Sequence, residues 1–279
     1  MPELPEVETI KEAMREAVEN ARIESIVIYN RHLRQDIPND FEKKICETQI
    51  IRLYRMAKYA IMVLANGYSV IWHFGMSGKI KITKEKNPSL EKHDHVVITT
   101  TNGTIIYNDP RRFGVVTLCK TNKINENPLL CHLGLDPFDK NLTITYLKKK
   151  LAKKHVSIKI ALLDQTIISG IGNIYASEAL YLAQISPLRE STKISTKELS
   201  GLIKAVRDVF KKAIAAGGST LHDYKKPNGD IGYFQLQHTV YGKEGKKCPH
   251  CIYPSKPCQG IQKVTQGGRS TYYCPHLQK

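Results

Sequence analysis

The sequence predicts an α+β protein with an N-terminal β-sandwich domain that contains an early helix, a C-terminal helical domain and a terminal Cys-rich hairpin. Three observations carry this prediction: strand-forming runs fill residues 1–132, helical periodicity follows residue 146, and four of the seven cysteines lie in the last 32 residues. A chain of 279 residues is long enough for two or three compact units. We therefore expect domains at 1–132, 146–238 and 239–279, with a linker at 133–145.

The early helix is predicted by a run of helix formers over 7–13, with Pro5 suited to the helix entry. The strand signal is clearest over 95–107, where Asn102-Gly103 separates two β-branched runs. Asn-Gly in this position indicates a hairpin, because both central residues of a type I′ turn need positive φ. The other runs with strand composition are 26–29, 59–64 and 69–74.

A change in the spacing of apolar residues predicts the helical domain. Gly and Pro at 133–137 mark the linker. Beyond it, apolar residues over 199–214 recur with the spacing of one helix face. Ser195 and Glu198 fit a capping box, and Gly217-Gly218 ends the run.

The tail over 239–279 is too short to hold a core of its own, so a metal would supply the missing stability. Cys248 and Cys251 form a C-x-x-C knuckle, and Cys274 begins a segment with the shape of its mate. Paired knuckles at this range predict a zinc ribbon with one structural Zn²⁺ in tetrahedral coordination. The candidates for the fourth ligand are Cys258, His276 and, more distantly, His250.

The net charge favours a polyanionic partner. The chain has 42 Lys+Arg against 26 Asp+Glu, a formal charge of +16, which suits nucleic acid or an anionic membrane surface. The basic residues are dispersed and no basic amphipathic helix stands out, which argues against a membrane. The acidic N-terminus has no positive region before an apolar stretch, and no run of about 18 apolar residues exists. We expect a soluble, cytoplasmic protein.

The N-terminus offers a nucleophile. Removal of Met1, which is expected before a small second residue, makes Pro2 an N-terminal secondary amine. Such an amine can attack an electrophilic carbon and form an iminium, and α-amino groups titrate near about 7.7–8.0, so a neutral fraction exists near neutrality. Glu3 is adjacent and could transfer protons. The alternative is a helix-entry proline followed by glutamates that complement the helix dipole.

The string Pro-Glu-Leu-Pro-Glu-Val-Glu-Thr from Pro2 to Thr9 resembles the start of formamidopyrimidine-DNA glycosylases, the bacterial enzymes that excise oxidised purines. The resemblance continues at separated places, in the family's order, over nearly the whole chain. Five such motifs in order are highly specific. The further matching segments are 57–59, 73–78, 93–95, 108–114 and 170–178.

The resemblance implies a bifunctional DNA glycosylase/AP lyase of base excision repair that removes 8-oxoguanine and formamidopyrimidines. Pro2 would attack the anomeric carbon, displace the base and hold the sugar as a Schiff base, so that β,δ-elimination can cut the strand. Glu3 would act as general acid/base, a role that typically raises the reaction rate by about 10²–10⁴-fold. Lys58 matches the lysine linked to β-elimination. Arg269, after Gly267-Gly268, matches the residue assigned to phosphate binding and δ-elimination.

A base inside a duplex must be extruded and its gap filled. By resemblance Met76, Arg111 and Phe113 fill the void, since Met and Phe can wedge into a stack and Arg can donate to the orphaned base. The segment 170–173 resembles the turn of the family's helix-two-turns-helix domain, where backbone amides approach a phosphate. The other DNA-contacting residues implied by the resemblance are His93, Arg112, Lys154, Lys159 and Asn173.

Three positions depart from the family's pattern. Leu277 stands where the family has a cysteine, which leaves the fourth zinc ligand open. His222 replaces an arginine in the segment between Gly217 and Phe234 that covers the everted base in the family, so lesion preference could differ. His155 stands where the family often has another lysine.

These features predict an enzyme that works as a monomer on double-stranded DNA containing oxidised bases or abasic sites, with structural zinc and no redox cofactor. The first alternative is an endonuclease VIII-like glycosylase for oxidised pyrimidines, which has the same fold and nucleophile. The second is a catalytically silent zinc-ribbon protein that binds nucleic acid, which would follow if retained Met1 blocks Pro2.

Overall fold

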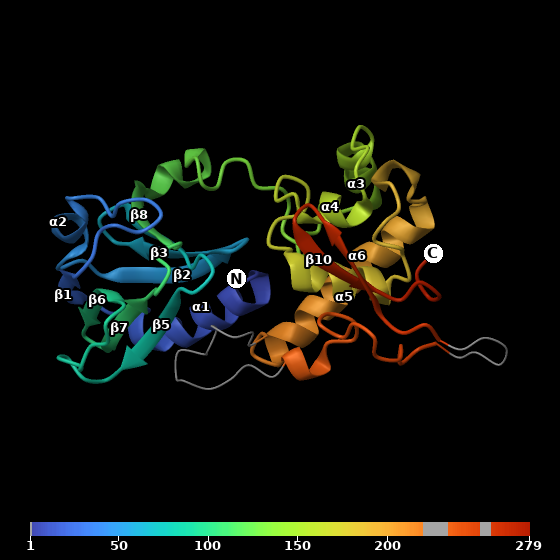
Figure 1. Ribbon diagram of the computed structural model, residues 1–279. Helices are drawn as coiled ribbons and strands as arrows, with labels where there is room; N and C mark the ends of the chain where they lie inside the picture. Colours follow the sequence, from blue (N-terminus) through green and yellow to red (C-terminus); the bar gives the residue numbers. More distant parts are fainter. Residues whose placement is uncertain (1, 220–233, 252–257) are drawn as a thin grey trace. The chain divides into compact units, whose positions relative to one another are not determined.

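Three stretches of the chain are described by the structure, a computed structural model (Figure 1). They are residues 2–219, 234–251 and 258–279. The substitution at His222 therefore lies outside the described residues. Within the described stretches, no helix combines the length and apolar character needed to cross a membrane.

The chain forms two compact units. The first comprises Met1–Cys131 and Ile214–Gln235, and the second comprises His132–Ala213 and Leu236–Lys279. Among the described residues, 214–219 therefore group with the N-terminal part of the chain. The domain bounds expected from the sequence remain a prediction.

The first unit contains two four-stranded antiparallel sheets. Their strand orders are β1-β6-β7-β5 and β2-β3-β4-β8, and α1 contacts strands of both. Its elements are α1 (Leu4–Val18), β1 (Ile23–Ile28), α2 (Phe41–Ile45), β2 (Ile50–Met56), β3 (Tyr59–Leu64), β4 (Tyr68–His73), β5 (Lys79–Thr83), β6 (Asp94–Thr100), β7 (Gly103–Asn108), β8 (Val115–Lys120) and η1 (Thr121–Glu126). The helix begins three residues before the expected run because Glu3 caps it.

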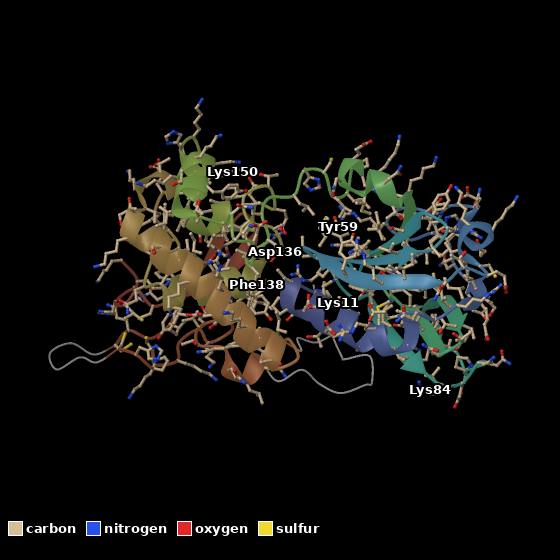
Figure 2. All side chains as sticks on the ribbon, turned by 180° about the vertical axis from the view of Figure 1, so that it is seen from behind. Lys11, Tyr59, Lys84, Asp136, Phe138 and Lys150 are labelled. Atoms are coloured by element: carbon tan, nitrogen blue, oxygen red, sulfur yellow. The ribbon has the colours of Figure 1, made fainter. Side chains whose placement is uncertain are left out.

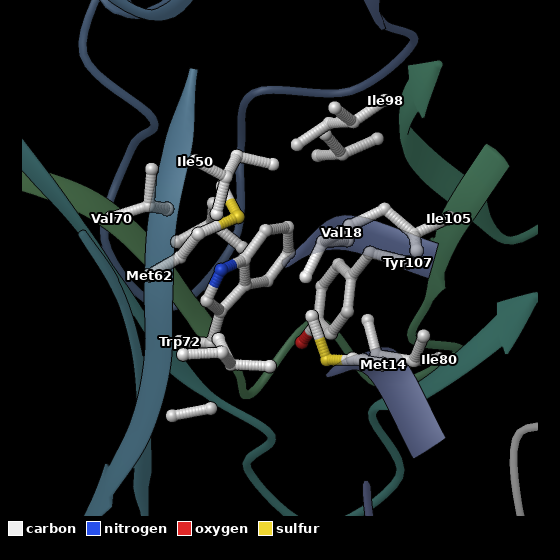
Figure 3. Packing of buried hydrophobic residues seen from close by; sticks show 14 of the residues in the cluster. Met14, Val18, Ile50, Met62, Val70, Trp72, Ile80, Ile98, Ile105 and Tyr107 are labelled. Atoms are coloured by element: carbon white, nitrogen blue, oxygen red, sulfur yellow. The ribbon is translucent and has the colours of Figure 1, made fainter. Parts of the chain in front are cut away.

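The core of this unit lies between the two sheets. Figure 3 shows Trp72 of β4 and Tyr107 of β7 in one packed cluster with Met14 of α1. The Trp72 and Tyr107 rings meet edge-on, with centroids 5.8 Å apart, a geometry that adds about 0.5–1.5 kcal/mol to the gain from burial. Apolar side chains from both sheets thus form a two-layer sandwich, and the sequence prediction is confirmed.

The hairpin expected over 95–107 is present, but its turn differs from the prediction. Thr100 pairs with Gly103, so the turn residues are Thr101 and Asn102, and neither has positive φ. The Thr100 hydroxyl accepts the N–H groups of Asn102 and Gly103 at 3.1 and 3.2 Å. This side-chain cap satisfies the turn amides without a type I′ backbone.

The second unit is helical, and a two-stranded hairpin closes it. Its elements are α3 (Ile144–Leu151), α4 (Ile158–Leu163), α5 (Asn173–Leu182), η2 (Ser191–Lys193), most of α6 (Thr196–Ala215), β9 (Gln262–Gln266) and β10 (Arg269–Tyr273); η3 (Phe234–Gln237) spans the division between the units. The predicted capping box at α6 is confirmed by the bonds of Ser195 N to Glu198 Oε2 (2.8 Å) and Glu198 N to Ser195 Oγ (3.3 Å). Gly267 and Gly268, with φ of 55° and 70°, form the tip of the hairpin.

Candidate active site and DNA-contacting residues

The start of α1 carries the candidate nucleophile and acid. Pro2 and Glu3 are both buried, and Glu3 is the N-cap residue. The Glu3 N–H donates to Glu6 Oε2 at 2.8 Å and the Glu3 carboxylate accepts the Glu6 N–H, which makes a reciprocal capping box. The cap holds Glu3 beside Pro2.

Glu6 has a structural role that the sequence leaves unassigned. Its side chain is buried, and while Oε2 binds Glu3, Oε1 accepts the Ser219 N–H at 2.8 Å. Gly218, at φ +78°, passes so close that a Cβ there would lie 3.2 Å from the Glu6 side chain. Glu6 therefore fastens residues 218–219 to the start of α1.

Lys58 lies in the turn between β2 and β3 and is almost buried. The preceding residue, Ala57, has φ of 53°, and its carbonyl accepts Arg55 Nη1 at 3.0 Å. Arg55 Nε donates in turn to Glu8 Oε2 at 2.7 Å, which ties the turn to α1. Burial alone would raise the pKa of Glu8, but hydrogen bonds from Lys11, visible on α1 in Figure 2, and from Arg55 lower it. The ionised Glu8 thus holds the turn that carries Lys58.

His73 ends β4 in a partly buried, positively charged setting. Its Nδ1 accepts the Gly75 N–H at 3.2 Å, so the ring is neutral with its proton on Nε2. Burial, reinforced by the positive charges of Lys58 and Arg34, lowers the pKa of His73 to about 4. The imidazole is therefore neutral at physiological pH.

The low pKa of His73 predicts a pH-dependent stability. An unfolded histidine titrates near about 6.5, so between about pH 6.5 and 4 the unfolded chain binds more protons than the folded chain. The contribution of the neutral His73 to the free energy of unfolding is therefore complete above pH 6.5, and it is lost as the pH falls toward 4. When the pH is lowered from 7 to 5, the free energy of unfolding measured in urea should fall by about 1–2 kcal/mol more in the wild-type protein than in His73→Gln. Equal losses in the two proteins would contradict this prediction.

The three expected void-filling residues lie on two loops of the first unit. Met76 follows β4, whereas Arg111 and Phe113 precede β8. Met76 and Phe113 are 42% and 44% exposed, so both apolar side chains are accessible from the solvent. The Arg111 guanidinium stacks over the Phe113 ring at 4.7 Å from its centroid. Exposed apolar tips with a stacked cation suit insertion between bases.

The two other expected contacts in this unit lie nearby in the sequence. Arg112 is exposed and has φ of 56°, a backbone conformation that non-glycine residues rarely adopt. The ring of His93 packs edge-on against His95, with centroids 6.4 Å apart.

Lys159 and Asn173 are brought together in the second unit, where they join α4, α5 and β10. Lys159 is fully buried, and its Nζ donates to Asn173 Oδ1 (2.6 Å), Thr271 Oγ1 (2.7 Å) and the Ser270 carbonyl (3.2 Å). Asn173 Nδ2 also donates to the Ser270 carbonyl at 2.9 Å. These bonds attach the first residue of α5 to the strand that starts at Arg269.

Unlike the buried Lys159, Lys154 forms an ion pair and Arg269 is exposed. Lys154 Nζ lies 2.8 Å from Asp164 Oδ2, and this ion pair lowers the pKa of Asp164 against the effect of burial. Arg269 is exposed beside the hairpin tip. His155, the departure from the family's lysine, has its Nδ1 2.8 Å from Glu190 Oε1.

Three thiols converge in the C-terminal segment. The sulfurs of Cys248, Cys251 and Cys274 all lie within 4.8 Å of one another, and the Cys251 and Cys274 sulfurs are 3.1 Å apart. Tyr181 of α5 places its Oη 3.1 Å from Cys248 Sγ. Burial, followed by the bond to Cys248, raises the pKa of Tyr181, so its hydroxyl stays protonated and can donate. The cluster can hold a metal ion through sulfur ligands.

Among the described residues, Cys258 is not part of the group of sulfurs that lie within 4.8 Å of one another, but Cys258 and Leu277 both pack against the apolar cluster that contains Cys248 and Cys274. The Cys258 sulfur accepts the Gly260 N–H at 3.4 Å. Backbone bonds from Cys248 and Gly260 lower the pKa of Cys258, and a hydrogen bond with the Cys251 thiol adds to this effect. His276 lies in the same turn as Leu277 and is half-buried.

Comparisons with known proteins agree with this arrangement. A family model described as the formamidopyrimidine-DNA glycosylase N-terminal domain matches residues 1–116, and one described as the formamidopyrimidine-DNA glycosylase H2TH domain matches residues 133–225. Formamidopyrimidine-DNA glycosylases of Zymomonas mobilis and Rickettsia africae are each 42% identical to this chain. Both matches cover 100% of this chain, with 100% and 99% of the respective relatives.

Solved structures of similar fold include the MutM (Fpg) protein of Thermus thermophilus, with 32% identity, a TM-score of 0.85 and coverage of 99% of this chain and 98% of that one. A complex between a Lactococcus lactis Fpg mutant and a Fapy-dG containing DNA gives 32% identity, a TM-score of 0.89 and full coverage of both chains. A complex between Lactococcus lactis Fpg and an abasic site containing DNA gives a TM-score of 0.88, 32% identity and 99% coverage of both. From its end-to-end sequence match, this chain belongs to the formamidopyrimidine-DNA glycosylase family.

Proposed function

We propose that the protein is a bifunctional DNA glycosylase/AP lyase of base excision repair that excises oxidised purines from duplex DNA. The observation that carries the proposal is the buried start of α1, where Pro2 precedes the helix and Glu3 caps it. Family membership and structural neighbours bound to damaged or abasic DNA support the same activity. With DNA as substrate, we place the activity in the bacterial cytoplasm.

The chemistry follows from a neutral amine. The Pro2 nitrogen attacks C1′ of the damaged nucleotide, and the electron pair of the glycosidic bond leaves with the base, which is protonated as it departs. Glu3 is the general acid/base in this exchange, and the sugar ring opens to leave an iminium on Pro2. The iminium acidifies the C2′ proton, whose loss expels the 3′ phosphate in β-elimination, with Lys58 as proton donor and phosphate contact. A second elimination, assisted by Arg269, expels the 5′ phosphate.

The test uses duplexes that carry one lesion and the unmodified protein. Borohydride trapping and product analysis on 8-oxoguanine opposite cytosine are expected to give a covalent adduct, free base and a strand cut at both phosphates. No adduct on this duplex or on a preformed abasic site, with tight binding retained, would overturn the lyase proposal in favour of a silent binder.

A pyrimidine-directed glycosylase is the second candidate. One structural neighbour, at a TM-score of 0.88, is a complex between Lactococcus lactis Fpg and an oxidized pyrimidine containing DNA. The same trapping assay on a dihydrouracil duplex separates the two, because the purine enzyme is expected to act faster on 8-oxoguanine. Faster action on dihydrouracil would reverse the assignment.

We propose that the exposed tips of Met76, Arg111 and Phe113 occupy the gap left by the everted base. Base-edge donation by Arg111 would recognise the orphaned partner. Lys159 is buried behind Asn173, so we propose that it supports phosphate binding by orienting Asn173 and the hairpin strand. The remaining residues proposed to contact the DNA backbone are His93, Arg112, Lys154 and Asn173.

Electrostatic docking predicts a steep salt dependence. If about six phosphates are neutralised, the logarithm of the association constant should fall with the logarithm of salt concentration at a slope of about −5. The measurement is fluorescence anisotropy with a duplex that carries a non-cleavable abasic analogue, over 50–300 mM salt. A slope near zero would contradict the docking proposal.

We further propose that the C-terminal cluster holds one structural Zn²⁺ through four thiolates. Cys248, Cys251 and Cys274 converge, and Cys258 is hydrogen-bonded to the same knuckle, so sulfur can complete the tetrahedral set that zinc prefers. When bound, the ion would fix the hairpin and hence the position of Arg269. Cys258 would thereby take the place of the second-knuckle cysteine that Leu277 replaces.

A further inference from the structure

The two loops that carry the void-filling residues are in direct backbone contact. The first loop comprises residues 74–78, between β4 and β5, and the second comprises residues 109–114, between β7 and β8. A Cβ on Gly75 would lie 2.4 Å from the backbone carbon of Phe113, and one on Gly114 would lie 2.7 Å from the His73 carbonyl oxygen. Real Cβ atoms do not approach backbone this closely, so glycine is required at both positions.

Asp109 lies where the two loops meet. It is fully buried, and its carboxylate accepts Ser77 Oγ at 2.5 Å, Gly114 N–H at 2.8 Å and Tyr107 Oη at 3.0 Å. Ser77 belongs to the loop of Met76, whereas Gly114 belongs to the loop of Arg111 and Phe113. A single carboxylate therefore bonds to both loops.

A second set of bonds extends this connection to the functional side chains. Ser77 Oγ accepts the Arg111 N–H at 3.2 Å, so one hydroxyl links Asp109 with Arg111. The Asp109 carbonyl accepts the Arg112 N–H at 3.2 Å and lies 2.8 Å from His95 Nε2. Burying a carboxylate is costly unless donors surround it, and here three donors compensate its two oxygens.

We propose that Asp109 is a positioning residue that joins the two loops into one rigid wedge, so that Met76, Arg111 and Phe113 enter the duplex together. This inference rests on the proposed function, because it assumes that these three residues fill the gap. If the two loops were not joined, each would lose conformational entropy when its side chains insert into the duplex. Held by Asp109, both loops have their insertion geometry before DNA binds.

The test is Asp109→Asn, which keeps the shape of the side chain. The Gly114 N–H can only donate, so the amide oxygen must keep that bond and the N–H₂ group must face Ser77 Oγ, which can then no longer donate to residue 109. The negative charge that strengthens the bonds of Asp109 is also lost. Excision of 8-oxoguanine is expected to fall on the order of 100-fold in kcat/KM, the size of effect that small misplacements produce. Trapping at a preformed abasic site, which has no base to extrude, is expected to fall much less.

A direct readout of the wedge is the fluorescence of 2-aminopurine placed opposite a tetrahydrofuran abasic analogue. Wild-type protein should change this fluorescence as the side chains insert, and Asp109→Asn should give a smaller change at saturating protein. Ser77→Ala is the milder variant, because it keeps the Asp109 carboxylate and removes only the two bonds that join the Ser77 hydroxyl to Asp109 and Arg111 of the second loop. If both variants act through one wedge, the double variant should be little worse than Asp109→Asn alone.

Asp94→Asn is the matched control for loss of a buried carboxylate. Asp94 is also buried in the first unit, but its bonds go to Lys81, the Glu91 N–H and Asn108. The Asp94→Asn variant should unfold at a lower urea concentration than wild type, with no change in the ratio of 8-oxoguanine excision to abasic-site trapping. A wild-type ratio and fluorescence change in Asp109→Asn and Ser77→Ala would overturn the inference, whereas an inactive wild-type protein would instead overturn the proposed function.

Discussion

A form of the protein that keeps Met1 before Pro2 is expected to lose trapping and base release by about 10³-fold or more, as when other enzymes lose their nucleophile. The amide nitrogen of an internal proline has neither a proton nor a basic lone pair, so it cannot form an iminium. The capping of α1 by Glu3 uses bonds within the helix start and should persist. Borohydride trapping on abasic DNA measures the loss, and binding to a tetrahydrofuran duplex shows whether the DNA site is intact.

Pro2→Gly separates the need for an amine from the need for proline. The variant keeps an N-terminal amine, but a primary amine gives a neutral imine that must be protonated, whereas proline gives a permanently charged iminium. We expect base release to fall at least about tenfold while some adduct at abasic sites remains, since a poorer electron sink weakens covalent catalysis. An undiminished adduct in the form that keeps Met1 would place the nucleophile elsewhere.

Loss of Cys258 is expected to have the second largest effect. Cys258→Ser should lower zinc affinity by more than about 100-fold, beyond the usual range for residues that only support a ligand. Zinc competition with a chromophoric chelator measures this affinity, and the visible spectrum of the Co²⁺-substituted protein reports how many thiolates bind. Because structural zinc stabilises small hairpins, the second strand cut should weaken relative to the first as Arg269 loses its position.

His276→Ala is the matched control for this prediction. His276 belongs to the second knuckle, so a merely structural disturbance of the hairpin should affect both variants alike. If His276→Ala loses zinc and Cys258→Ser keeps it at wild-type affinity, the fourth ligand is the histidine.

Elements whose signals are local could be predicted from the sequence. The capping box of Ser195 and Glu198 forms as expected because its partners are three residues apart. The sandwich follows from strand runs whose apolar side chains need a second layer. The hairpin turn was misplaced by one residue, because the hydroxyl of Thr100 competes for the turn amides with the Asn-Gly preference.

The candidate site also contains some features that the sequence predicts and others that only the fold reveals. Pro2 and the wedge residues are predicted from their match to the family's motifs, whereas the knuckle cysteines are predicted from their spacing. Lys159 looks in the sequence like a phosphate ligand among other lysines, yet in the fold it is buried against Asn173 and Thr271. No sequence spacing reveals that contact, since Thr271 lies more than a hundred residues away.

The sequence by itself indicated the order of the domains and the family, and it made Pro2 the candidate nucleophile. Only the tertiary structure decided that Glu6 holds Ser219, that Asp109 bonds to both wedge loops and that Cys258 reaches the knuckle of Cys248. The physical reason is that a buried polar group must find partners wherever the folded chain supplies them. Those partners are set by packing, and their distance along the sequence leaves no local pattern.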